Sequence, residues 1–234
     1  MIFASFLKAV GQIGDPRFRR VLLFGVGLTL ALLVAAYAAV LWVIQVTVGD
    51  TTTLPLIGEV TWVGDLLGAG SFLLMLVLSV FLMVPVASAI TSMFLDTVAE
   101  AVEERHYPGL SPARPVPFGE ALKDTVNFLG ILIVANIVAL ALYAVFTPFA
   151  LFIFWGLNGY LLGMEYFQLA AMRRVGREGA RALRRRHRWT IWAAGVLMAM
   201  PLSVPLVNLL IPILGAATFT HLYHAIQARP DPSG

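Results

Sequence analysis

Two adjacent arginines, Arg19 and Arg20, have side chains that could hold a tetrahedral oxyanion. Each guanidinium offers a planar fork of N–H donors that fits oxygen acceptors. An apolar helix is expected to start beside them, and its positive dipole end would add to the attraction. The same arginines could instead anchor the cytoplasmic end of a membrane helix among lipid phosphates. The sequence leaves both roles open.

A second group of arginines lies in the run Arg173 to Arg188, RRVGREGARALRRRHR. It contains eight of the sixteen Lys and Arg residues of the chain and stands between two long apolar blocks. Short basic loops stay on the cytoplasmic side when membrane segments insert. We therefore expect this run to mark the cytoplasmic side and to contact lipid headgroups, with an anion-collecting surface as the alternative.

Three polar residues within apolar surroundings are candidates to line a transport pathway. Glu165 is the strongest, because a carboxylate in lipid is costly and needs a partner or water; it is also only about two helical turns from Arg173 and could simply reach the interface. Asn158 follows Gly156-Leu157, and Asn208 lies among prolines, where the backbone is expected to be irregular. Each asparagine could otherwise join neighbouring helices by hydrogen bonds.

The composition is that of an all-α integral membrane protein. Hydrophobic residues make up 59% of the 234 residues and charged residues 12%, against about 25% charged in soluble domains. The net charge of +3 is small and forms no long basic groove, so no nucleic-acid partner is expected. The sequence has neither a nucleotide-binding glycine loop nor a hydrolase or metalloprotease motif. His221 and His224 lack a third ligand nearby, so we expect no enzyme, cofactor or metal site.

The first half of the chain predicts an amphipathic helix and two membrane helices. Residues 1–20 hold the amphipathic helix, with Phe3 and Phe6 on its apolar side, and a basic loop. Residues 21–48 and 65–95 are long enough to cross a bilayer, and Pro85 is expected to kink the second. The loop 49–64 has no Lys or Arg and is expected to be external. From Asp96 onward, the sequence predicts an amphipathic helix with one apolar side buried. Its other side should turn three residues to water: Glu100, Glu103 and Glu104.

The second half predicts two proline-broken helical hairpins, 125–172 and 189–226, within a single membrane domain 1–234. The first breaks at Thr147-Pro148; the second contains Pro201, Pro205 and Pro212. Unbroken arms of about 12 to 14 residues in the second hairpin are shorter than the roughly 20 needed to cross, so it is expected to be partly inserted. Backbone at such breaks must be covered by protein or line a wet cavity, which indicates transport.

The segment from Pro205 to Pro212, PLVNLLIP, followed by Gly215-Ala216-Ala217-Thr218, resembles the last hairpin of the CysZ family of bacterial inner-membrane sulfate permeases. The order of the elements along the chain is similar too, and Glu165-Tyr166 falls where the family has an acidic or amide residue followed by Tyr. The resemblance implies two partly inserted hairpins, a homo-oligomer, and sulfate passage for cysteine synthesis.

In that family the anion contact is a Gly, an apolar residue and two arginines before the first long helix. The matching residues here are Arg17, Phe18, Arg19 and Arg20, so Arg17 replaces the glycine. The sequence thus predicts a permease or channel for sulfate or a similar oxyanion in the bacterial inner membrane, surrounded by membrane lipids. The alternative is a non-transporting scaffold that organises lipids or partner proteins. A third hypothesis, ranked below these two, is an unrecognised membrane enzyme.

Overall fold

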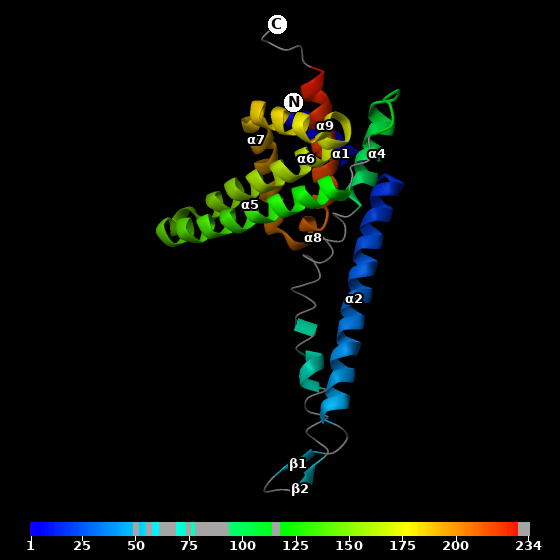
Figure 1. The fold of residues 1–234 in the computed structure, drawn as a ribbon, viewed down its shortest axis with the longest axis vertical. Helices are drawn as coiled ribbons and strands as arrows, with labels where there is room; N and C mark the ends of the chain where they lie inside the picture. Colours follow the sequence, from blue (N-terminus) through cyan, green and yellow to red (C-terminus); the bar gives the residue numbers. More distant parts are fainter. Residues whose placement is uncertain are drawn as a thin grey trace.

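The computed structural model describes residues 1–48, 52–54, 58–60, 69–73, 76–77, 94–113 and 118–228. These residues are almost entirely helical, which confirms the predicted class, with one short two-stranded ribbon in addition (Figure 1). The principal helices are α1 (Ile2–Gly11), α2 (Pro16–Val48), α4 (Leu95–His106), α5 (Phe118–Val145), α6 (Ala150–Arg186), α7 (Arg188–Ala199) and α9 (Ile211–Gln227).

Helix α2 projects from the rest of the molecule (Figure 1). It is one of three helices in the described ranges that are long and apolar enough to cross a membrane, over Pro16–Val43, Val126–Val145 and Thr147–Arg186. At its far end, strands β1 (Thr52–Leu54) and β2 (Gly58–Val60) pair antiparallel within the predicted external loop. Most of the predicted helix 65–95, including Pro85, lies outside the described residues; the pieces 69–73 and 76–77 are helical.

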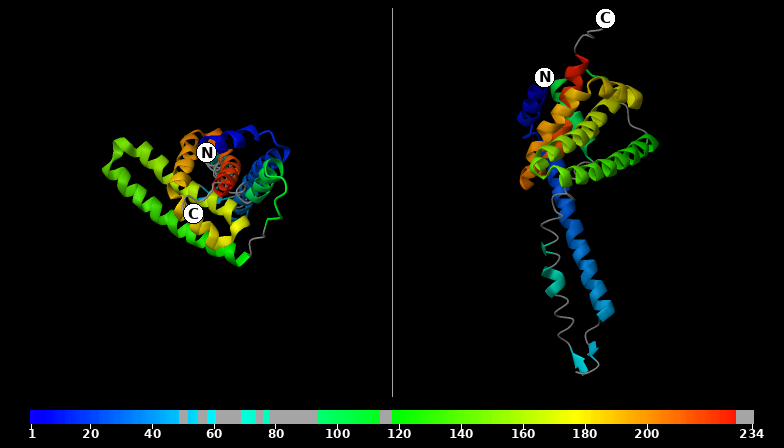
Figure 2. Two further views of the ribbon diagram at one scale, coloured as in Figure 1. Left: turned by 90° about the horizontal axis from the view of Figure 1, so that it is seen from above. Right: turned by 90° about the vertical axis from the view of Figure 1, so that its left-hand side faces the viewer.

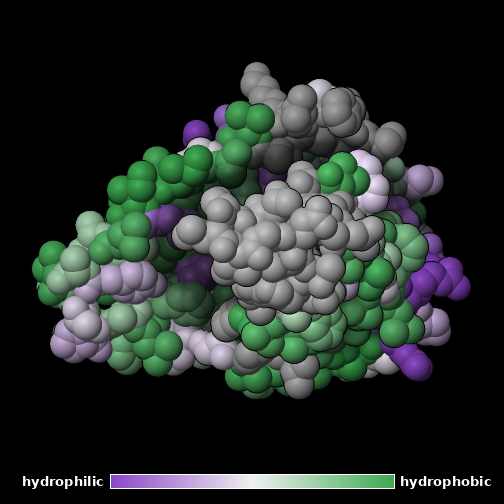
Figure 3. All heavy atoms as spheres, turned by 90° about the horizontal axis from the view of Figure 1, so that it is seen from below, coloured by the Kyte–Doolittle hydropathy of each residue, from purple (hydrophilic) through white to green (hydrophobic). Residues whose placement is uncertain are grey.

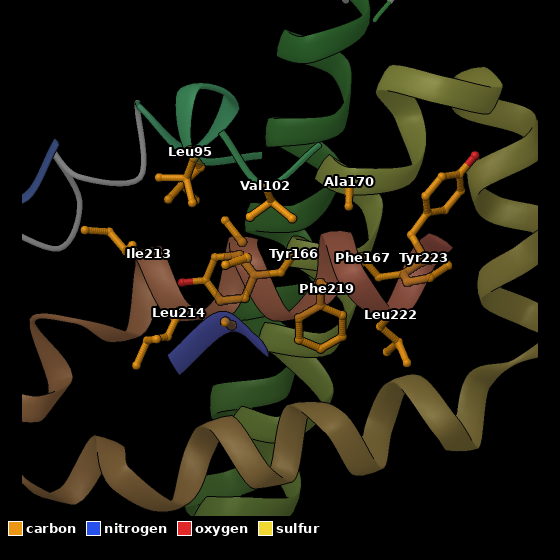
Figure 4. Close-up of a cluster of buried hydrophobic side chains, with 14 of the residues drawn as sticks. Leu95, Val102, Tyr166, Phe167, Ala170, Ile213, Leu214, Phe219, Leu222 and Tyr223 are labelled. Carbon is orange, nitrogen blue, oxygen red and sulfur yellow. The ribbon is translucent and has the colours of Figure 1, made fainter. Parts of the chain in front are cut away.

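Helix α9 is the centre of the fold, and Figure 2 shows it surrounded by other helices when seen from above. Thirteen consecutive residues, from Ile211 to Tyr223, are buried, as expected of a helix that is apolar on every side. Tyr166 and Phe167 of α6 pack against it, as do Leu95 and Val102 of α4 (Figure 4). Gly215 makes room for the Tyr166 ring, since a Cβ there would lie 2.5 Å from it.

Helix α1 packs against α9. Ser5 and Ala9 are buried, and Gln12, just beyond the helix, is buried as well. Phe3, at 63% exposure, is on the opposite side, which suits an amphipathic helix at the membrane interface. The structure therefore has the predicted helix, and the side that packs against the protein also includes Ile2 and Phe6, both partly buried.

The first hairpin consists of α5, a 3-10 turn η1 (Thr147–Phe149) and α6, so the predicted break at Thr147-Pro148 is confirmed. It runs across the direction of α2 (Figures 1 and 2). Its surface is largely apolar where Figure 3 shows it, on the left of that view. Helix α6 continues past the predicted end at 172 and bends at Gly176, whose φ is +71°. We call residues 177–186, beyond this bend, the arginine arm.

The second hairpin has arms of 12 residues in α7 and 17 in α9, the latter longer than predicted. The connection is a 3-10 turn η2 (Met200–Ser203), extended backbone at Val204 and the short helix α8 (Pro205–Asn208). Helix α7 lies tightly on α6 because glycines face each other: a Cβ on Gly195 would collide with the Gly159 carbonyl oxygen.

Candidate functional site

The four residues that match the family's anion contact lie at the start of α2. Asp15 precedes them and caps the helix: its Oδ1 accepts a hydrogen bond from the Arg17 backbone N–H at 2.9 Å, as a helix N-terminus requires. Phe18 is buried in the core, at 1% exposure, which fixes the direction of its neighbours. Arg19 and Arg20 point outward and are exposed.

Arg17 differs from the arginine pair because it has a partner. Its guanidinium forms an ion pair with Glu104 of α4 at 2.5 Å, and both side chains are largely exposed. This contact holds the pKa of the Glu104 carboxyl below its ordinary value. The hydrogen bond from Arg17 is the largest cause, and the positive charge of Arg17 adds to it. Over the parts of the chain that the structure describes, neither Arg19 nor Arg20 forms an ion pair.

A buried ion-pair network joins α4 to the middle of α6. Arg173, only 4% exposed, donates to the Asp96 carbonyl oxygen at 3.0 Å and to Glu100 Oε1 at 3.2 Å. Arg174 forms two hydrogen bonds with Glu103, whose side chain is 6% exposed. The prediction that Glu103 faces water is therefore wrong, whereas Glu100 is exposed as predicted. Burial of this carboxylate is possible because both of its oxygens accept charge-assisted hydrogen bonds.

The network extends to α9 through histidines. His224 Nε2 is 3.2 Å from Glu103 Oε1, and because a carboxylate can only accept, this ring nitrogen carries the hydrogen. Burial by itself would raise the pKa of the Glu103 carboxyl. Hydrogen bonds from His224 and Arg174, with the charge of Arg173, overcome that effect and lower the pKa to about 2. Tyr107 stacks on His224 and hydrogen-bonds His221 Nδ1 at 3.0 Å.

A cavity of about 680 Å³ lies between the start of α5 and the two parts of α6 on either side of the Gly176 bend. The arginine arm contributes Arg181, Arg184 and Arg185 to its wall, and Glu165 contributes a carboxylate. The lining also includes five apolar side chains: Phe128, Ile131, Met164, Leu169 and Met172. The bend thus brings the basic run predicted from the sequence over a polar residue that was singled out separately.

The structure does not bring all the predicted site residues together. Glu165 lies in the cavity on α6, whereas Arg19 and Arg20 lie at the start of α2, which contacts α4 instead. Asn158 donates to the Phe154 carbonyl within its own helix at 2.9 Å, and Asn208 ends α8. Neither asparagine lines the cavity. The anion-binding role of the arginine pair and the pathway role of the asparagines stay predictions.

The acidic side of α4 was not recognised from the sequence as part of a site. The available signal was the spacing of Asp96, Glu100 and Glu103, which places three carboxylates on one side of a helix. A chain with so many arginines needs such partners wherever an arginine is buried. The sequence does not say which arginine each carboxylate meets.

Comparison with known proteins supports the resemblance. The family described as sulfate transporter CysZ/etoposide-induced protein 2.4 matches residues 5–212. No curated protein matches the chain. The family match spans α1, α2, the first hairpin and most of the second hairpin, up to the first residues of α9. The chain therefore belongs to the sulfate transporter CysZ/etoposide-induced protein 2.4 family.

Proposed function

We propose that the protein is a membrane permease or channel for sulfate or a similar oxyanion. It acts in the bacterial inner membrane as a homo-oligomer, supplies sulfur assimilation and hydrolyses no ATP. Membership of a family whose description names a sulfate transporter supports transport as the class. The same description names an etoposide-induced protein, so the substrate has to be argued from the residues.

The observation that carries the proposal is the exposure of Arg19 and Arg20 at the capped start of α2. Arg17 is engaged by Glu104 and Phe18 is buried, so these two guanidinium groups are what the segment offers to an anion. Two forks of N–H donors beside the positive end of a helix dipole suit a doubly charged tetrahedral oxyanion. The arginine pair is the proposed anion-binding site.

The break in the second hairpin supports a pathway. Between Met200 and Leu210 the backbone passes through a 3-10 turn, an extended residue and a single helical turn. Irregular backbone at membrane depth is tolerated only when protein covers it or when it lines water. We assign Asn208 to this part of the pathway, with Asn158 and Glu165 as further polar residues along it.

Radiolabelled sulfate uptake into liposomes that contain the purified protein tests the proposal. The test variant is R19E/R20E, and the matched control is K8E/R186E, which changes the net charge equally at exposed positions on α1 and α6. We expect saturable uptake that falls at least tenfold in R19E/R20E, because both donor forks are lost, and stays within twofold in the control. Equal flux in the two variants would show that the arginine pair is not the site.

The competing function is a non-transporting scaffold that organises lipids or partner proteins. The largely apolar surface of the first hairpin favours it (Figure 3), since such a surface is available to lipid or to another membrane protein. If the unmodified protein moves neither sulfate, thiosulfate nor phosphate in the same liposomes, the scaffold function replaces the permease.

A further inference from the structure

We infer that the cavity beneath the arginine arm binds the headgroup and upper acyl chains of an anionic phospholipid. This site is separate from the proposed anion-binding site on α2. It shares Glu165 with the proposed pathway, but lipid binding there can be measured without transport. The argument rests on the charge, the size, the apolar wall and the position of the cavity.

The charge of the cavity favours an anion. Among the described residues that line it are four arginines and two carboxylates, those of Asp96 and Glu165. The Asp96 carboxylate forms an ion pair with Arg173, because its Oδ1 lies 3.7 Å from Arg173 Nε. The arginine arm lines the cavity with three guanidinium groups, those of Arg181, Arg184 and Arg185. Arginine is the residue that recognises phosphate through paired hydrogen bonds.

The size and the apolar wall exclude a small inorganic anion as the occupant that fills the site. A volume of about 680 Å³ would hold on the order of twenty water molecules at roughly 30 Å³ each, far more space than one tetrahedral ion needs. Phe128, Ile131 and Leu169 are among the apolar residues that line it. A ligand with a phosphate at one end and hydrocarbon at the other satisfies both halves of this lining.

The position of the cavity matches the level of lipid headgroups. A smaller cavity of about 310 Å³ shares Met164, Arg184 and Arg185 with it, so the two are parts of one cleft. Tyr160 and Trp192, both partly exposed, line this second part. Tyrosine and tryptophan gather where the bilayer meets water. The arginine arm also lies toward the same end of the molecule as the N-terminus and the last turn of α9, opposite the β ribbon (Figure 1).

Native mass spectrometry of the delipidated, detergent-solubilised protein tests the inference. The probes are dioleoyl phosphatidylglycerol, dioleoyl phosphatidylcholine, glycerol phosphate and sulfate, each added over a concentration series. The test variants are R184Q/R185Q, which removes charge from both parts of the cleft, and I131W, which fills the apolar part without a change in charge. The control K8Q/R186Q removes the same charge from residues that line neither part.

We expect saturable binding of phosphatidylglycerol that weakens about tenfold in R184Q/R185Q, through loss of charge-assisted hydrogen bonds, and to a similar extent in I131W. The control should bind like the unmodified protein, and phosphatidylcholine should bind more weakly. Equal losses in R184Q/R185Q and the control would overturn the inference, because general attraction would then explain binding. Sulfate or glycerol phosphate that binds as tightly as the lipid would also overturn it and indicate a site for soluble anions.

The I131W variant decides the question if R184Q/R185Q does not fold, since Ile131 forms no part of the ion-pair network. Full phosphatidylglycerol binding by folded I131W would overturn the inference. Because lipid binding is measured without transport, its loss or retention says nothing about sulfate flux, and failure of either proposal leaves the other intact.

Discussion

Arg174 and Glu103 meet through two parallel hydrogen bonds, 2.8 Å from Nε to Oε1 and 2.6 Å from the terminal nitrogen to Oε2. Seventy-one residues separate them in the sequence. The pair is mostly buried and fastens α4 to α6, and His224 adds a link to α9. These contacts hold together the helices that surround the core.

Loss of the Glu103 carboxylate should destabilise the protein strongly. Glu103→Ala leaves Arg174 buried without its main partner, and removal of one member of a buried pair costs about 3 to 5 kcal/mol. Glu100→Ala is the matched control on the same helix; its side chain is 57% exposed, so about 1 kcal/mol or less is expected. Thermal unfolding in detergent measures both. Equal melting temperatures would show that the buried network contributes no more than the exposed contact.

The stability that Glu103 supplies should depend on pH in the acid range. Its pKa is lowered from 4.5 to about 2 in the folded protein, so the folded state binds the proton less readily than the unfolded state. The contribution, about 3 kcal/mol at most, is fully present above pH 4.5 and is lost as the pH falls toward 2. The difference in unfolding free energy between the unmodified protein and Glu103→Gln should shrink over that window. A constant difference would contradict the lowered pKa.

The capping residue of α2 should matter for the arginine pair. Asp15→Ala removes the acceptor for the Arg17 backbone N–H and for Gln12 Nε2, and loss of such a cap costs about 1 kcal/mol. Asp15→Asn keeps a side-chain acceptor and should be milder. If the cap orients Arg19 and Arg20, sulfate uptake should fall more in Asp15→Ala than in Asp15→Asn. Equal uptake in the two would separate helix capping from anion binding.

The contact between α6 and α7 should not tolerate a methyl group at Gly195. A Cβ there would collide with the Gly159 carbonyl, which is backbone and cannot turn aside. Gly195→Ala should therefore destabilise the protein by about 2 to 3 kcal/mol, as overpacking does. Gly156→Ala is the control, because its Cβ would lie 4.0 Å from Trp192. Comparable melting temperatures for the two variants would mean that the helices separate easily.

The sequence predicted most of the helical elements because long apolar runs and prolines have direct physical meaning. Both hairpins and the break at Thr147-Pro148 followed from them. Side-chain orientation was predicted less well. Glu103 and Glu104 are adjacent, but only Glu104 is exposed, and periodicity alone did not reveal that Arg174 would cover one of them. The bend at Gly176 was missed because a single glycine within a helical pattern is usually tolerated.

The candidate site was predicted only as separate residues. The sequence identified the arginine pair, the basic run and Glu165, each from its residue type. It could not show that the arginine arm folds back over Glu165, because that depends on the φ of one glycine and on the packing of α5. Which carboxylate pairs with which arginine depends on the tertiary structure. The sequence alone does not identify these pairs, because it contains several carboxylates that could pair with any one arginine.

The packing of α1 against α9 has a consequence for biosynthesis. These helices are almost two hundred residues apart, so a chain that emerges from the ribosome makes α1 long before its partner exists. Until then the helix can rest at the membrane surface on its apolar side. The core cannot close before α9 has been made, so translation of the last helix is the step that completes the tertiary structure.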